Sequence, residues 1–73
     1  MRTFDMHGKR VLAAEKLFHD QLNESRLKNR LIEVMFITGS GVIQKRLIAL
    51  AEESELHHYV QLSNRGCLVI EFE

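Results

Sequence analysis

The middle of the chain reads LIEVMFITGSG, from Leu31 to Gly41. Its first part, Leu31–Ile37, is almost entirely apolar, which is typical of a strand buried on both faces in the middle of a parallel or mixed sheet. The tetrapeptide Thr38–Gly41 ends this strand, because its two glycines permit a tight turn. Apolar residues then return at the spacing of an amphipathic helix that runs to about Glu53: Ile43, Leu47, Leu50 and Ala51. The stretch therefore predicts a strand, a turn and a helix.

A further strand is predicted at the start of the chain, where apolar Phe4 and Met6 alternate with polar Thr3, Asp5 and His7. Successive side chains of a strand point to opposite faces of its sheet. The alternation over residues 2–7 therefore places Asp5 and His7 on the same face of this strand.

Gly8 separates this first strand from a predicted helix over residues 9–26. Apolar residues recur there at helical spacing: Val11, Ala14, Phe18 and Leu22. The polar segment 25–30 is expected to form the turn that follows, with Leu27 as its apolar anchor.

The end of the chain predicts an antiparallel hairpin. Polar and apolar residues alternate over residues 57–62 and again over residues 67–72, and the turn-rich tetrapeptide Ser63–Gly66 joins the two runs. The complete order is β-α-β-α-β-β. We therefore predict an α/β fold of the α+β two-layer type, with two helices on a mixed four-stranded sheet.

Length and composition agree with one folded domain over residues 1–73, because so short a chain cannot bury two separate cores. Apolar residues make up 45% and charged residues 27%, as in ordinary globular proteins. The net charge is zero, so any anion site must be local. We expect a cytoplasmic protein without a membrane partner, because neither a spanning segment nor a signal peptide is recognisable. The single cysteine, Cys67, excludes an internal disulfide and a cysteine-rich zinc site.

The candidate site lies where two strands end. Connections between parallel neighbouring strands bring their carboxyl ends to one edge of the sheet, so we expect His7-Gly8 beside Thr38–Gly41. The free amides of the following helix favour an anion such as phosphate, and Lys45 and Arg46 would add positive charge. A simpler alternative is that Ser40 only caps this helix and that the glycines only form the turn.

The pair Asp5 and His7 suggests acid–base chemistry, because a carboxylate beside an imidazole can orient it and raise its basicity. The alternative is a local role, in which His7 makes a hydrogen bond at the strand end and Asp5 caps the following turn. For this short spacing taken alone, the local role is the better interpretation.

Two segments resemble the signatures of the small MutS-related (Smr) domain family. Phe4–Gly8 resembles the L-D-L-H-G signature that opens these domains, and Ile37–Ile43 resembles their T-G-x-G motif with the start of its helix. The closing segment Gly66–Phe72 is similar to their last strand, so the resemblance extends from Thr3 to Glu73.

The resemblance implies a fold similar to the C-terminal domain of bacterial translation initiation factor three. It also implies nucleic-acid binding, with endonuclease activity in many members. Asp5 and His7 match the acid and the imidazole of the first signature, and Gly39 and Gly41 match the glycines of the second.

The chain departs from the family pattern at several points. Phe4 and Met6 replace the usual leucines, which should preserve packing, and Gln44 stands where a basic residue often follows the glycine turn. Many relatives have histidine at the position of Thr38, but threonine is a common alternative there. The last hairpin turn is shorter than usual, and the extension that often precedes the first signature is absent. Glutamine at position 44 removes a phosphate contact of the family pattern, unless Lys45 or Arg46 replaces it.

The leading hypothesis is a small domain that binds DNA or RNA and cleaves it. His7 or Asp5 would deprotonate the attacking hydroxyl of RNA, or Asp5 would hold a divalent metal for DNA hydrolysis. A single carboxylate supplies too few ligands for a good metal site, so we favour metal-independent chemistry without a cofactor.

Two other hypotheses stay open. The first is a nucleic-acid or ribosome-binding module without catalysis, and the second is a protein-interaction domain that self-associates through its sheet or helices. A positive cleft around His7 would favour the nucleic-acid functions, and an exposed apolar patch elsewhere would favour the interaction domain.

Overall fold

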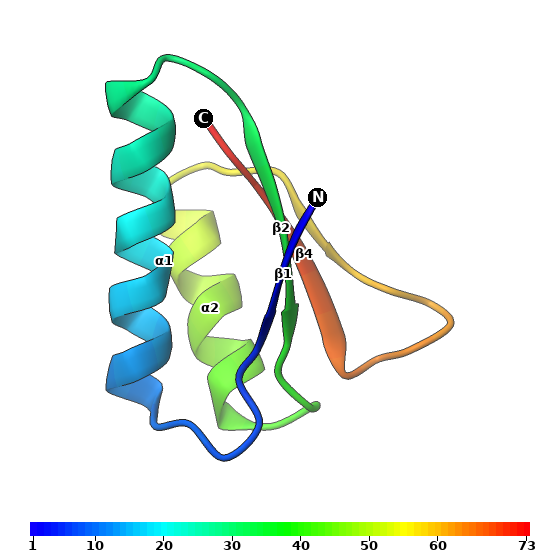
Figure 1. Ribbon diagram of the computed structural model, residues 1–73. Coiled ribbons are helices and arrows are strands. Elements are labelled where there is room, and N and C mark those ends of the chain that lie inside the picture. The colour runs from blue at the N-terminus through cyan, green and yellow to red at the C-terminus, as the bar shows by residue number, and fades with distance from the viewer.

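The computed structural model describes all residues from Met1 to Glu73. Its elements follow in the order β1 (Arg2–Asp5), α1 (Val11–Leu27), β2 (Ile32–Ile37), α2 (Val42–Glu53), β3 (His58–Val60) and β4 (Cys67–Phe72) (Figure 1). The predicted order of strands and helices is confirmed. Neither helix is long and apolar enough to cross a membrane.

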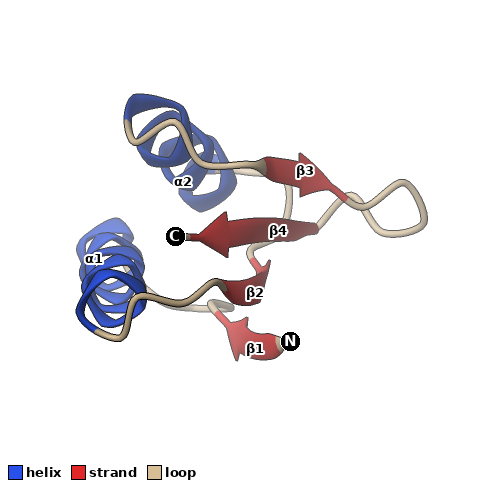
Figure 2. Cartoon of the chain, turned by 90° about the horizontal axis from the view of Figure 1, so that it is seen from above, coloured by secondary structure: helices blue, strands red, loops and turns tan.

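The four strands form one mixed sheet in the order β1-β2-β4-β3. Strand β1 is parallel to β2, whereas β4 lies antiparallel between β2 and β3. Both helices pack on one face of this sheet, and no helix covers the other face (Figure 2). The predicted two-layer α+β class and the mixed sheet are therefore confirmed.

The core lies between the helices and the covered face of the sheet. Phe18 of α1, Phe36 of β2 and Phe72 of β4 are completely buried. Their rings meet edge to face, with centroids 5.1 Å apart for Phe18 and Phe72 and 6.3 Å apart for Phe36 and Phe72. Such aromatic pairs contribute roughly 0.5–1.5 kcal/mol each beyond the burial of their area. The three rings join α1 to the two central strands.

Strand β2 is an inner strand, but it is not buried on both faces as predicted. Burial alternates along it: Ile32, Val34 and Phe36 are buried, whereas Glu33, Met35 and Ile37 are partly exposed. The second set faces the side of the sheet that no helix covers. The apolar run is therefore a sign of a central position in the sheet and not of a second covering layer.

The first strand is shorter than predicted, because it ends at Asp5 and not at His7. The amide of Met6 still donates to the carbonyl of Ile37, but the carbonyl of Met6 accepts from the amide of Lys9 and closes a turn. Gly8 occupies this turn with φ of +73°, a left-handed conformation that glycine adopts without strain. His7 thus lies in a turn and no longer follows the alternation of the strand.

Helix α1 extends from Val11 to Leu27, in agreement with the predicted helix that ends at about Arg26. Leu27 is 87% exposed and anchors nothing, so the prediction of an apolar anchor there is wrong. The buried residue at this end is Ser25, whose hydroxyl donates to the carbonyl of Leu22 and whose carbonyl accepts from the amide of Arg30. The hydrogen bonds of Ser25, and not an apolar side chain, therefore fix the end of this helix.

The hairpin is present, with a short first strand. Strand β3 covers only His58–Val60, and the connection to β4 extends over residues 61–66. The amide of Gln61 donates to the carbonyl of Cys67, which closes the base of this connection.

Candidate functional site

The carboxyl ends of β1 and β2 lie side by side, as the sequence predicted. Asp5 is paired in register with Ile37, and the amide of Met6 donates to the carbonyl of Ile37 at 2.9 Å. Helix α2 begins at the same end of the molecule (Figure 1). We call this region the glycine edge, defined as His7-Gly8, Thr38–Gly41 and the first turn of α2.

Asp5 caps the turn that follows its strand. Its Oδ1 atom accepts a hydrogen bond from the backbone amide of His7 at 2.8 Å. The carboxylate therefore orients the backbone of His7 and not its imidazole, which matches the local alternative. The imidazole of His7 is exposed, and no hydrogen bond or ion pair in the protein holds it.

The glycine turn is fixed by the hairpin between β3 and β4. The amides of Thr38 and Gly39 both donate to the carbonyl of Gly66, at 2.8 and 3.1 Å. The Thr38 hydroxyl donates to the carbonyl of Gly39 at 2.6 Å. A side chain at Gly66 would approach the Cα atom of Gly39 to 3.3 Å, so the two backbones are in close contact. The amide of Gly39 is thus already engaged and is not free for an anion.

The open amides begin one residue later. Gly41 is the N-cap of α2 and no side chain caps this helix, so Ser40 is not the cap that the simpler alternative required. The first backbone hydrogen bond of the helix runs from the amide of Lys45 to the carbonyl of Gly41 at 3.2 Å. The amides of residues 40–44 make no hydrogen bond within the protein. This uncapped N-terminus carries partial positive charge.

Gln44 has a structural role that the sequence did not suggest. It is only 8% exposed, and its Nε2 atom donates to the carbonyl of Arg65 at 2.7 Å and to Oγ1 of Thr38 at 3.4 Å. Gln44 therefore ties the first turn of α2 to the hairpin and to the glycine turn. Its burial could have been inferred from the sequence, because Gln44 stands three residues before Leu47 and so lies on the buried face of the helix.

The two cations predicted for this site have different surroundings. Lys45 is exposed and lies in the first turns of α2. Arg46 instead pairs with Glu15 of α1, and the hydrogen bond from this carboxylate raises the pKa of the Arg46 guanidinium. Arg46 is thus engaged between the two helices. Exposed Arg65, which no pattern in the sequence indicated, is held at the glycine edge through its carbonyl, which accepts from Gln44.

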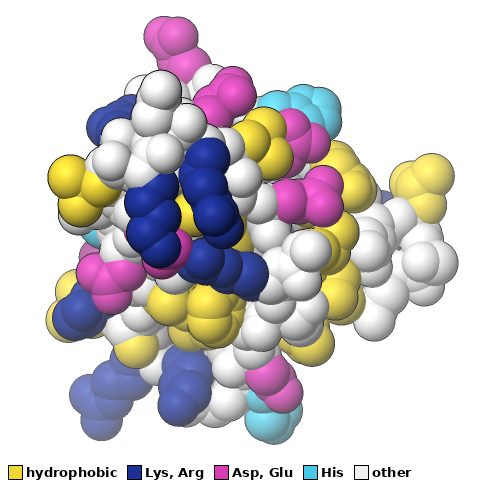
Figure 3. Space-filling model, turned by 45° about the horizontal axis from the view of Figure 1, so that its top comes forward, with side chains coloured by type: hydrophobic (Ala, Val, Ile, Leu, Met, Phe, Trp, Pro, Cys, Tyr) yellow, Lys and Arg dark blue, Asp and Glu magenta, His cyan; other side chains and the backbone are white.

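Basic side chains also gather at the opposite end of the molecule (Figure 3). Arg26 and Arg30 line a shallow hollow there, beside Lys28, whose ammonium pairs with Glu24 at 3.1 Å. We call these three residues the basic end. The close spacing of these three cations in the sequence could have indicated a basic surface. The sequence pattern was interpreted only as a polar turn.

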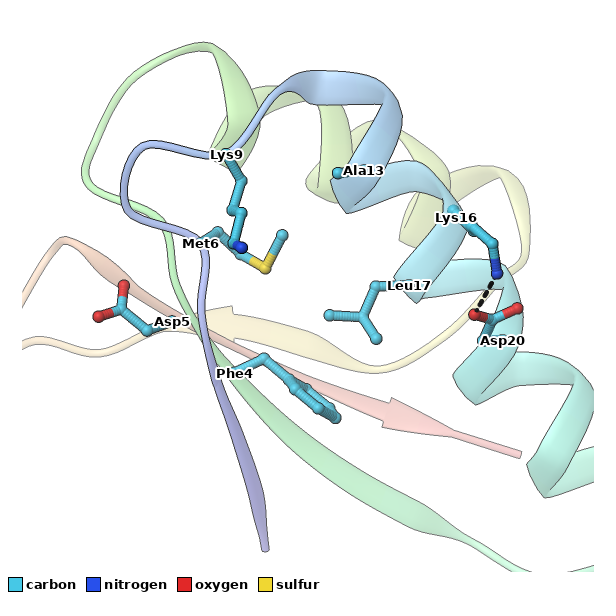
Figure 4. Close-up of a pocket in the computed structure, with 8 residues that line it drawn as sticks. All are labelled: Phe4, Asp5, Met6, Lys9, Ala13, Lys16, Leu17 and Asp20. Atoms are coloured by element: carbon cyan, nitrogen blue, oxygen red, sulfur yellow. Dashed lines mark hydrogen bonds and ion pairs between the residues drawn. The ribbon is translucent and has the colours of Figure 1, made fainter.

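The glycine edge is not a cleft. The two hollows of the surface lie elsewhere, and neither includes His7 or the glycine turn. The larger one, of about 330 Å³, lies between β1 and α1, and Asp5 is the only predicted site residue that lines it (Figure 4).

Comparisons of the chain with protein-family models, with curated proteins and with solved structures gave no match.

Proposed function

We propose that this domain binds nucleic acid through the glycine edge. The observation that carries the proposal is the meeting of two strand ends with an uncapped helix N-terminus, whose amides at residues 40–44 are open. Helix N-termini bind phosphate because their free amides point outward and carry about half a positive charge. DNA or RNA, including ribosomal RNA, supplies that phosphate.

The phosphate contact begins at Ser40 and not at Gly39. The amide of Gly39 is bonded to Gly66, whereas the exposed Ser40 offers both its amide and its hydroxyl. Exposed Lys45 and Arg65 provide the positive charge that the chain as a whole lacks. Thr38 and Gln44 hold this surface in place, because their hydrogen bonds to the hairpin fix the position of the glycine turn.

The two segments that resemble the Smr signatures meet at this same edge. We propose on this basis that the chain is a small Smr-like domain, with Asp5, Gly8, Gly39 and Gly41 shaping the backbone around the site. Asp5 acts through the turn it caps, and Gly8 supplies the left-handed conformation of that turn.

Electrophoretic binding to labelled single-stranded RNA and to duplex and nicked DNA tests the proposal. Lys45→Glu should weaken binding by about tenfold, since reversing one phosphate contact changes the binding free energy by about 1.4 kcal/mol. Lys28→Glu is the matched control, because Lys28 is exposed at the opposite end of the molecule. Loss of binding in Lys28→Glu alone would move the interface to the basic end and contradict the proposal.

Cleavage of the bound strand is a second candidate function. The observation that favours it is the exposed imidazole of His7 at the edge where phosphate is proposed to bind. A neutral imidazole can accept the proton of a ribose 2′-hydroxyl as this oxygen attacks the adjacent phosphorus and the P–O5′ bond breaks. The products are a 2′,3′-cyclic phosphate and a 5′-hydroxyl, whose oxygen takes its proton from the imidazolium or from water. The open amides at residues 40–44 and Lys45 would then stabilise the charge that develops on the phosphate oxygens.

A further inference from the structure

The outer edge of β1 is free for pairing with another strand. β1 is an end strand of the sheet, and no element lies beyond it (Figure 2). The amide of Met6 points to β2, because it donates to the carbonyl of Ile37. Main-chain groups of a strand point alternately to the two sides, so those of Thr3 and Asp5 point outward. β1 pairs with β2 alone, and none of the backbone hydrogen bonds of the turns and loops engages these groups.

A hollow of about 330 Å³ runs beside this free edge, between β1 and α1. Its apolar lining comes from both elements: Phe4 and Met6 from the strand side, and Ala13 and Leu17 from the helix (Figure 4). A strand added at the edge of β1 would point every second side chain toward the helices and so into this hollow. The free edge and the hollow thus form one docking groove.

The charges around the groove leave one cation without a partner. Lys16 pairs with Asp20 at 2.9 Å, so these two charges compensate each other. The Asp5 carboxylate points away from the hollow and accepts from the His7 amide (Figure 4). The ammonium of Lys9 lies next to Met6 over the hollow and has no ion pair. An occupant that complements this groove carries an acidic group near Lys9.

We propose that the groove binds an extended segment of another protein, which adds to the sheet as a fifth strand beside β1. An apolar side chain of this segment fills the hollow against Phe4 and Leu17, and an acidic side chain two residues away reaches Lys9. Backbone hydrogen bonds to Thr3 and Asp5 supply affinity, and the two side chains supply specificity, as in other cases of strand addition. The groove shares Asp5 with the nucleic-acid surface, because this residue also caps the turn that holds His7.

The test uses the synthetic peptide Ac-Thr-Glu-Thr-Leu-Thr-Glu-Thr-NH2, whose symmetric acidic residues suit either strand direction. Its addition to the ¹⁵N-labelled protein should shift the amide resonances of Thr3, Asp5 and Leu17. It should also slow hydrogen exchange at the outward amides of Thr3 and Asp5. The same peptide with Lys in place of both Glu residues should bind about tenfold more weakly, because it repels Lys9.

Two variants test whether the peptide binds by strand addition or in another way. Thr3→Pro removes one outward amide and leaves the β1–β2 hydrogen bonds intact, because proline is tolerated on the free side of an edge strand. It should abolish peptide binding without lowering the melting temperature. Lys9→Glu should reverse the preference, so that the Lys peptide binds better than the Glu peptide. The control Lys45→Glu, an exposed change on α2, should leave peptide binding unaltered.

The proposal is overturned if the peptide shifts only resonances elsewhere, or if Lys9→Glu leaves the preference unchanged. Shifts at Thr3 and Asp5 that grow with protein concentration alone would identify a second copy of this chain as the occupant. A response of Leu17 to the decanoate anion, with none to the peptide, would identify a small apolar anion instead. Either of these two results contradicts a peptide partner.

Discussion

Gln44 is a buried polar residue whose amide joins two loops that are distant in sequence. Its donors reach the carbonyl of Arg65 and the hydroxyl of Thr38, so removing the side chain leaves these acceptors without their partner. Both hydrogen bonds are partly buried, and the loss of one such bond costs roughly 0.5–1.5 kcal/mol. The consequence is both a less stable fold and a looser glycine turn.

We therefore predict that Gln44→Ala lowers the free energy of unfolding by about 1–3 kcal/mol in urea denaturation. Asn23→Ala is the control, because Asn23 is exposed on α1 and alanine is the better helix former, so this change should not lower the free energy of unfolding. Equal stability of the Gln44→Ala variant and the parent would show that the hairpin does not depend on this contact.

His7 is the residue whose chemistry can be tested most simply, because its exposed side chain fills no cavity. His7→Ala should remove cleavage of RNA, with and without magnesium, while the thermal melt stays unchanged. His19→Ala is the matched control, since His19 is also exposed but lies on α1. Full cleavage by folded His7→Ala would exclude His7 as the general base, and no cleavage by the parent would leave binding alone as the function.

Asp5→Asn tests the turn that holds His7. An amide oxygen accepts the hydrogen bond from the His7 backbone less strongly than a carboxylate does. We expect reduced cleavage with only a small loss of stability, because Asp5 is exposed. Binding should be affected less than cleavage in the same preparation, since most affinity comes from phosphate contacts. A large loss of binding would indicate that Asp5 shapes the phosphate site itself.

At the scale of elements, Arg2 ties the edge strand β1 to helix α1. Its guanidinium donates to both carboxylate oxygens of Glu24, at 2.9 and 2.6 Å, and to Gln21 at 2.8 Å. The hydrogen bond from Arg2, with a second from Lys28, lowers the pKa of Glu24 to about 2. This contact therefore stabilises the fold above the ordinary pKa of glutamate and is lost as the pH falls toward 2.

We predict that an NMR titration of the Glu24 carboxyl carbon gives a pKa of about 2 in the parent. In Arg2→Ala it should return toward the ordinary range, and the stability of that variant should fall less steeply between pH 4.5 and 2. Arg26→Ala is a control, because no ion pair joins Arg26 to Glu24. An unchanged Glu24 pKa in Arg2→Ala would contradict the tie between the two elements.

The order of the elements could be predicted because hydrophobic periodicity is local information. The apolar run that becomes β2 correctly predicted an inner strand, but a second covering layer depends on parts of the fold that the run itself does not encode. Leu27 failed as an anchor for the same reason, since helical spacing does not specify which residues have a partner.

The candidate site was predictable only in its outline. The rule for parallel strands correctly predicted that the ends of β1 and β2 meet. The spacing of Asp5 and His7 allows the carboxylate to accept a hydrogen bond from either the imidazole or the backbone amide of His7. In the structure it accepts from the backbone amide. The contact of Gln44 with Arg65 joins residues 21 positions apart, which no local pattern specifies.

On the scale of the whole molecule, zero net charge limits how nucleic acid can be bound. The glycine edge offers two exposed cations, Lys45 and Arg65, whereas the basic end offers Arg26, Lys28 and Arg30. Each neutralised phosphate of a single strand contributes about −0.7 to the slope of log K against log salt concentration. Binding through the glycine edge alone therefore predicts a slope of about −1.4. A slope well beyond −2 would mean that the basic end also contacts the strand.

The most direct test of the glycine edge is the titration of ¹⁵N-labelled protein with a short oligouridylate, followed by amide chemical shifts. We predict the largest changes at Ser40, Gly41, Val42 and Ile43, whose amides are open, with smaller changes at His7 and Arg65. Inorganic phosphate should shift the first group alone, because it occupies a single phosphate position. Changes confined to the basic end, at Arg26–Arg30, or no change at saturating oligonucleotide, would contradict nucleic-acid binding at the glycine edge.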